Sequence, residues 1–178
     1  MIFHETKLKN VFIIEIERLE DERGFFARVW DNEEFKEHDL NSKLVQCNIS
    51  FNKKKGTLRG MHFQKKPYEE DKLVRCTRGK IFDVIVDLRR ESKTFKMWIG
   101  IELSCDNNKM VYVPKGLAHG YLTLEDNTEV FYQVSQYYHK DFEDGIRYDD
   151  ETFKIKWPFK PRIISEKDLL HKKFIDEQ

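Results

Sequence analysis

Apolar and polar residues alternate along several short stretches of the chain, which is the period-2 pattern of a β-strand. In the stretch 44–52, Val45, Cys47, Ile49 and Phe51 alternate with Gln46, Asn48, Ser50 and Asn52. Further strands are predicted at 11–17, 81–88, 109–113 and 128–138, with Gly, Asp and Asn turn signals between them. Many short strands at near-regular spacing predict an all-β sandwich or closed barrel.

Two segments instead carry helix signals. The stretch 31–38 opens with Asp31 and Asn32, which are good N-caps, and 165–172 opens with Ser165 ahead of acidic residues. We expect short helices that flank the β-structure.

The polar face of the stretch 44–52 has two interpretations. On most strands such a face is simply solvated, whereas in a small barrel it can line a ligand cavity. Because Gln46 and Asn48 are uncharged amides, we favour the wall of a hydrogen-bonding cavity.

Composition narrows the classes of function. The 178 residues contain 32 Lys plus Arg and 32 Asp plus Glu, so the formal net charge is zero and a nucleic-acid partner is disfavoured. The 14 Phe, 7 Tyr and 3 Trp are enough for a core, and we expect one domain over 1–178. We expect no membrane span and no signal peptide, since no long apolar run is present. Three cysteines without a Cys-x-x-Cys pair favour a reducing, cytoplasmic compartment and disfavour structural zinc.

Two histidines lie in matching glycine-containing frames. GTLRGMHFQ (56–64) contains His62, and PKGLAHG (114–120) contains His119. These frames resemble the two cupin motifs, but Gln64 replaces the second histidine of the first one, so a metal site would need a substitute ligand such as Glu69 or Glu70. We therefore expect no metal. The plainer alternative is that both histidines are core residues.

The motifs in their order resemble the dTDP-4-dehydrorhamnose 3,5-epimerase family over nearly the whole chain. They are DERGFF (21–26), VQCN (45–48), LRGMH (58–62), DKLVR (71–75), AHG (118–120), YYH (137–139), GIRYDD (145–150), IKWP (155–158) and SEKD (165–168). The resemblance implies a cupin-type jelly-roll barrel with short flanking helices, working without metal or cofactor. It also implies a homodimer that acts on nucleotide-linked 4-keto-6-deoxy sugars in rhamnose-like deoxysugar biosynthesis.

The resemblance assigns four catalytic residues. His62 is the base that removes a proton beside the 4-ketone, and Asp168 is its carboxylate partner. Lys72 stabilises the enolate, and Tyr132 returns a proton to the opposite face, so Val130, Tyr132 and Val134 should share the inner face. Taken singly, Lys72 is an ordinary surface residue, Tyr132 a core residue and Asp168 a helix cap.

Binding residues follow from the same resemblance. It assigns Arg23, Phe26, Gln46, Asn48 and Arg59 to the nucleotide, with the segment Arg23–Phe26 reaching into the partner's site. The remaining substrate contacts are His119, Tyr138 and Glu143. Arg59 and His62 are three residues apart, so both face inward only if Gly60 allows a bulge. We expect the resulting cavity to be locally positive.

Arg28 departs from the family pattern, which has a glutamate there. A carboxylate accepts a hydrogen bond from N3 of thymine, whereas an arginine suits cytosine N3, so the hypothesis is a base other than thymine. Otherwise Arg28 faces solvent or a phosphate.

Other functions remain open. Within the fold they are a single-site epimerase at C3 or C5 and a 3,4-ketoisomerase, acting on a CDP- or GDP-linked sugar. Outside it they are a metal-dependent cupin enzyme and a non-catalytic sugar-binding jelly roll.

Overall fold

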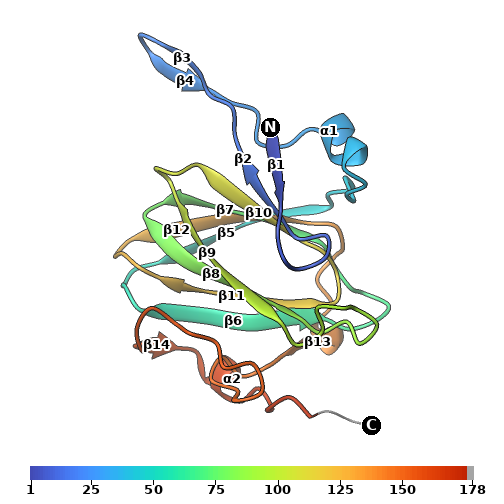
Figure 1. Cartoon of the computed structure of the whole chain (residues 1–178). Helices are drawn as coiled ribbons and strands as arrows, with labels where there is room; N and C mark the ends of the chain where they lie inside the picture. Colours follow the sequence, from blue (N-terminus) through green and yellow to red (C-terminus); the bar gives the residue numbers. More distant parts are fainter. Residues whose placement is uncertain (176–178) are drawn as a thin grey trace.

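Two antiparallel sheets face each other in the computed structural model, which describes residues 1–175 (Figure 1). The first sheet has the order β1-β2-β10-β7-β12-β5 and the second β13-β6-β11-β8-β9, with β14 pairing in parallel with β6. The strands of the first sheet are β1 (Ile2–Glu5), β2 (Phe12–Glu15), β5 (Gln46–Asn52), β7 (Lys72–Arg78), β10 (Lys109–Val113) and β12 (Thr128–Val134). Those of the second are β6 (Thr57–Gln64), β8 (Lys80–Asp87), β9 (Trp98–Ser104), β11 (Leu117–Thr123), β13 (Glu143–Gly145) and β14 (Ile163–Ile164). This arrangement confirms the cupin-type jelly-roll barrel.

Three short elements and one hairpin lie outside the two sheets. They are β3 (Leu19–Asp21) paired with β4 (Gly24–Phe26), α1 (Asn32–Glu37), the 3₁₀ turn η1 (Lys140–Phe142) and α2 (Glu166–Leu169). The β3–β4 hairpin projects away from the barrel beyond β2 (Figure 1). No helix among residues 1–175 is long and apolar enough to cross a bilayer.

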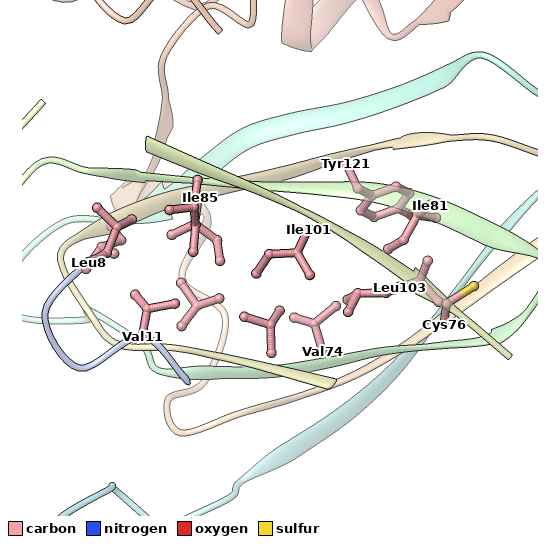
Figure 2. Packing of buried hydrophobic residues seen from close by; sticks show 14 residues of the cluster. Leu8, Val11, Val74, Cys76, Ile81, Ile85, Ile101, Leu103 and Tyr121 are labelled. Carbon is pink, nitrogen blue, oxygen red and sulfur yellow. The ribbon is translucent and has the colours of Figure 1, made fainter. Parts of the chain in front are cut away.

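The main core fills one part of the space between the sheets. Ile81 and Ile85 of β8 and Ile101 and Leu103 of β9 pack against residues of β7, β10 and β11, with Leu8 and Val11 at one end (Figure 2). The strand predicted at 81–88 is confirmed as β8, and its Val84 and Val86 pack on the other side of the same sheet. There the C-terminal segment covers them, so β8 is buried on both faces.

A second apolar layer lies outside the first sheet. Phe35 of α1 packs with Ile14, Leu73, Met110 and Tyr112. The helix is fixed by its predicted cap, since Asp31 accepts hydrogen bonds from the N–H groups of residues 33 and 34.

Two predicted elements end earlier than expected. The strand at 128–138 stops at Val134, because Ser135 turns to Asp71 through both its backbone N–H (3.0 Å to the carbonyl) and its hydroxyl (2.9 Å to Oδ2). The helix at 165–172 ends at Leu169, and the following chain is drawn back to the core, where the Phe174 N–H donates to the Asp150 carboxylate.

Candidate active site

A histidine and a carboxylate from distant parts of the chain meet at the edge of the second sheet. His62 lies in β6 and Asp168 in α2, and the His62 Nε2 to Asp168 Oδ1 distance is 2.8 Å. Ser165 caps α2 by accepting the Asp168 N–H (3.1 Å), and the Gly60 N–H donates to Asp168 Oδ2 (3.1 Å). Both carboxylate oxygens are thus held, which fixes the orientation of the pair.

The electrostatics of this pair determine which imidazole nitrogen is basic. Burial by itself would raise the pKa of Asp168, but the hydrogen bonds and charge supplied by His62 and the Gly60 N–H hold it below its ordinary value. The ionised carboxylate accepts the proton on Nε2 of His62. Nδ1 of the neutral ring is therefore left as the proton acceptor.

A bulge in β6 turns both Arg59 and His62 toward the cavity. On the neighbouring strand β11, the partners of these two residues are only two positions apart, at Tyr121 and His119. Gly60 makes this possible, because its φ is +125° and a Cβ there would lie 2.6 Å from the Gly120 Cα. The predicted bulge is confirmed.

The facing sheet supplies an acid and a cation. Tyr132 (β12) and Lys72 (β7) line the same cavity of about 500 Å³ as His62, together with Val130 and Val134, so the predicted inner face of β12 is confirmed. Burial, followed by the charge of Glu70, raises the pKa of Tyr132, so its phenol stays protonated at neutral pH. A base and a phenol on facing walls can act on opposite faces of one bound ring.

Within a single chain, the charged side chains that line the cavity are two of each sign. Lys72 pairs with Glu70 (Nζ to Oε1, 3.1 Å), and both side chains are nearly buried. Arg59 and Glu143 add one charge of each sign. Arg23, which the prediction of a positive pocket also counted, lies outside the cavity of its own chain, so that prediction depends on a second copy of the chain.

The polar face of β5 lines this cavity, which confirms the interpretation of this face as a cavity wall rather than a solvated surface. Gln46, Asn48 and Ser50 face inward, whereas Ile49 and Phe51 are exposed on the outer side. The Gln46 side-chain oxygen accepts the backbone N–H of Tyr138 (2.9 Å), which ties the loop after β12 to the cavity wall.

The remaining predicted substrate contacts also line the cavity. His119 is buried and its Nε2 lies 2.8 Å from Asp83 Oδ2, so this ring has a fixed orientation. Tyr138 donates to Glu143 (2.6 Å), and this bond raises the tyrosine's pKa to about 12. Burial opposes ionisation of Glu143, but the hydrogen bonds from Lys167 and Tyr138 lower its pKa below the ordinary value.

Three predicted nucleotide contacts are not brought to this cavity. Arg23 is exposed in the β3–β4 hairpin and bonds Asp21, and Phe26 in the same hairpin is 66% exposed. The Arg28 guanidinium lies 3.5 Å from Asp31 Oδ2, at the N-cap of α1. Within one chain, therefore, these residues do not contribute to the site.

The cupin-type metal ligands are not assembled at Gln64. Its amide braces the surrounding loops, donating to the Tyr68 and Tyr137 carbonyls and accepting the His139 N–H. Glu70 faces Lys72 rather than a histidine. Among residues 1–175 one group of three possible metal ligands does lie together, formed by His62, Asp168 and His171.

Sequence reasoning did not name Tyr121 or His171, and it did not pair Glu70 with Lys72. Tyr121 lines the cavity and its hydroxyl bonds Ser50 (2.8 Å), a position indicated by its spacing of two from His119 on one strand face. Glu70 is two residues from Lys72, which would have shown that the cation has a partner. His171 is three residues beyond Asp168, the spacing that places two helical side chains on one face.

Comparison with known proteins identifies the family. Residues 5–176 match the family model described as dTDP-4-dehydrorhamnose 3,5-epimerase. A protein of that name from Shigella flexneri is 40% identical over 97% of this chain and 95% of its own length. The crystal structure of a dTDP-4-dehydrorhamnose 3,5-epimerase from Elizabethkingia anophelis superposes with a TM-score of 0.94 at 39% identity, covering 98% of this chain and 96% of the other. A Legionella pneumophila dTDP-6-deoxy-D-glucose-3,5-epimerase, solved in complex with dTDP-4-keto-L-rhamnose, superposes with a TM-score of 0.91 at 36% identity. The match covers 97% of this chain and 92% of the other. The chain therefore belongs to the dTDP-4-dehydrorhamnose 3,5-epimerase family.

Proposed function

We propose that this protein inverts C3 and C5 of a dTDP-linked 4-keto-6-deoxyhexose by removing and returning protons, within deoxysugar biosynthesis. The observation that carries the proposal is the 2.8 Å His62–Asp168 pair, which faces Tyr132 and Lys72 across one cavity. The Legionella relative binds a dTDP-linked keto sugar, which supports this class of substrate.

The reaction begins at a carbon beside the ketone. Nδ1 of neutral His62 takes the proton from that carbon, and the electron pair moves onto O4 as an enolate. Asp168 stabilises the imidazolium that forms, and the Lys72 ammonium stabilises the charge on O4.

Inversion needs a proton from the other side of the ring. The Tyr132 phenol, on the opposite sheet, donates its proton to the carbon from that face and becomes a phenolate. Solvent then reprotonates the phenolate and removes the proton from His62. Because the same ketone activates C3 and C5, one pair of groups serves both carbons.

We propose further that the nucleotide site is completed by a second copy of the chain. The β3–β4 hairpin projects from the barrel (Figure 1), and Leu19, Phe25 and Phe26 on it are all more than half exposed. Apolar rings on a projecting hairpin are typical of an interaction surface. In a homodimer, this hairpin would bring Arg23 and Phe26 to the partner's cavity.

The base of the nucleotide is best assigned as thymine. The family and the dTDP-linked sugar bound by the Legionella relative support thymine, whereas Arg28, which motivated the alternative of a cytosine base, lies beside Asp31 in its own chain. Titration with dTDP, CDP, UDP and GDP tests this assignment, and tighter binding of CDP than of dTDP would reverse it.

We also place the protein in the cytoplasm. All three cysteines are free, and Cys76 is buried in the core, as suits a reducing compartment.

The main test is turnover of a dTDP-linked 4-keto-6-deoxyhexose in D₂O, followed by ¹H NMR. We expect deuterium to enter at both C3 and C5, with inversion at both. Exchange at a single carbon would instead identify a single-site epimerase. Migration of the ketone from C4 to C3 would identify a ketoisomerase.

A further inference from the structure

A second imidazole lies against the His62–Asp168 pair, outside the proposed reaction. His171 follows α2, and its Nε2 lies 3.8 Å from Asp168 Oδ1. Its ring meets the His62 ring nearly edge to face, with centroids 5.6 Å apart and an interplanar angle of 69°. The three side chains form a compact group at the edge of β6.

His171 has an unusual environment for a polar side chain. It is 9% exposed, and its Nε2 is buried without a hydrogen-bond partner among residues 1–175. Such an atom costs free energy unless something binds it. Gly145 makes room for the ring, since a Cβ at that position would lie 2.5 Å from the same nitrogen.

We propose that His62, Asp168 and His171 form a binding site for a transition-metal dication such as Zn²⁺, and that the bound metal inhibits the enzyme. One ligand atom from each residue lies within 4.8 Å of the others. With metal–ligand bonds of about 2.0–2.1 Å, neighbouring ligands in a tetrahedral site are about 3.3 Å apart. The distances from Asp168 Oδ1 to His62 Nε2 (2.8 Å) and to His171 Nε2 (3.8 Å) lie on either side of this value.

The donor set selects the class of metal. Two imidazoles and one carboxylate suit Zn²⁺, Co²⁺ or Ni²⁺, whereas Mg²⁺ and Ca²⁺ prefer oxygen ligands throughout. His62 also lines the cavity of about 500 Å³, from which water can supply a fourth ligand.

Inhibition follows from which nitrogen the metal takes. A metal at Nε2 of His62 replaces the proton shared with Asp168. The neutral ring then carries its proton on Nδ1 and cannot accept another. The metal is therefore an inhibitor rather than a cofactor. This consequence rests on the proposed function, whereas metal binding itself does not.

The binding test uses untagged, chelator-treated protein titrated with Co²⁺, read by the visible absorption of a four-coordinate site and by displacement with Zn²⁺. The test variant is His171→Asn, which lacks Nε2, and the matched control is His4→Asn on the surface. We expect the wild type and the control to bind one metal per chain, and His171→Asn to bind it at least about 10-fold more weakly. Equal affinity in His171→Asn, or no binding by the wild type, would overturn the proposal.

Two further readouts keep the proposal testable if His171→Asn fails to fold. In wild-type protein with ¹⁵N-labelled histidine, Zn²⁺ should shift the ring signals of His62 and His171, and shifts confined to other histidines would refute the site. In turnover assays, each protein is compared with its own metal-free rate. Zn²⁺ should inhibit the wild type reversibly and His171→Asn far less. If the wild type shows no turnover, the proposed function fails, while the Co²⁺ spectrum still decides the metal site.

Discussion

Replacing Asp168 by Asn changes which atoms of the proposed site carry protons, without changing the shape of the site. Oδ1 of Asp168 faces His62 Nε2 at 2.8 Å, and Oδ2 accepts the Gly60 N–H at 3.1 Å. The Gly60 N–H can only donate, so the single oxygen of the asparagine must stay on it. The amide NH₂ is then directed at His62.

This arrangement fixes the wrong tautomer of the base. An NH₂ group donates, so Nε2 of His62 must offer its lone pair, and the ring proton moves to Nδ1. The ring can then no longer remove a proton from the substrate through Nδ1, and the charge that stabilises the imidazolium is also lost. A positioned base contributes about 10²–10⁴-fold, or about 3–5 kcal/mol of barrier. We expect kcat to fall within this range and the affinity for dTDP to change by less than about threefold.

The assay is deuterium incorporation at C3 and C5 of the keto sugar in D₂O, with dTDP binding measured by calorimetry and folding by thermal melting. Asp144→Asn is the matched control, because Asp144 is also near the site but pairs with Lys65 on the surface (3.3 Å). The control should keep nearly full turnover. An Asp168→Asn protein that melts normally and exchanges both carbons at the wild-type rate would refute the role of the pair.

Three other predictions follow from the structure. Tyr132→Phe should still allow His62 to exchange the substrate's C–H protons in D₂O but should lower inversion at least about 10²-fold. NMR that shows equal losses of exchange and inversion would contradict a role confined to reprotonation. Asp87 is buried and, despite burial, hydrogen bonds chiefly from Arg89 lower its pKa to about 2. Because the folded pKa lies below the unfolded one, its stabilisation should be present above about pH 4 and lost as the pH falls toward 2. Asp87→Asn should cost about 2 kcal/mol at pH 7 and flatten that decline, measured by urea unfolding across pH. Phe26→Ala should weaken dimerisation and dTDP binding together in light scattering and calorimetry, and an unchanged dTDP affinity would argue against a shared site.

Local patterns along the chain were sufficient for five of the fourteen strands observed in residues 1–175, namely β2, β5, β8, β10 and β12. Strand 109–113 was predicted with its observed bounds, and the strand predicted at 81–88 is observed as β8 (Lys80–Asp87). The ends of 128–138 and 165–172 were wrong for a shared reason. The carboxylates of Asp71 and Asp150, which lie far away in the sequence, accept hydrogen bonds that redirect the backbone. No local pattern encodes these long-range hydrogen bonds.

The sequence likewise predicted some features of the site and not others. The family resemblance named His62, Asp168, Lys72 and Tyr132, and the structure brings the side chains of all four together. His62, Lys72 and Tyr132 line one cavity, and Asp168 bonds His62 from outside it. Motifs did not indicate that Glu70 neutralises Lys72, because charge pairing depends on side-chain direction rather than on residue type.

The sequence by itself determined the strand periodicity, the uncharged face of β5, the glycine needed for the bulge in β6 and the family. These features are local: each depends on residues within a few positions of one another or on an ordered set of short motifs. Only the tertiary structure decided that Lys72 pairs with Glu70 in the cavity, that the β3–β4 hairpin lies away from its own cavity and that His171 lies beside the His62–Asp168 pair. Each of these depends on side-chain direction or on contacts between segments distant in sequence, in the last case a packing of α2 against β6 across more than half the chain.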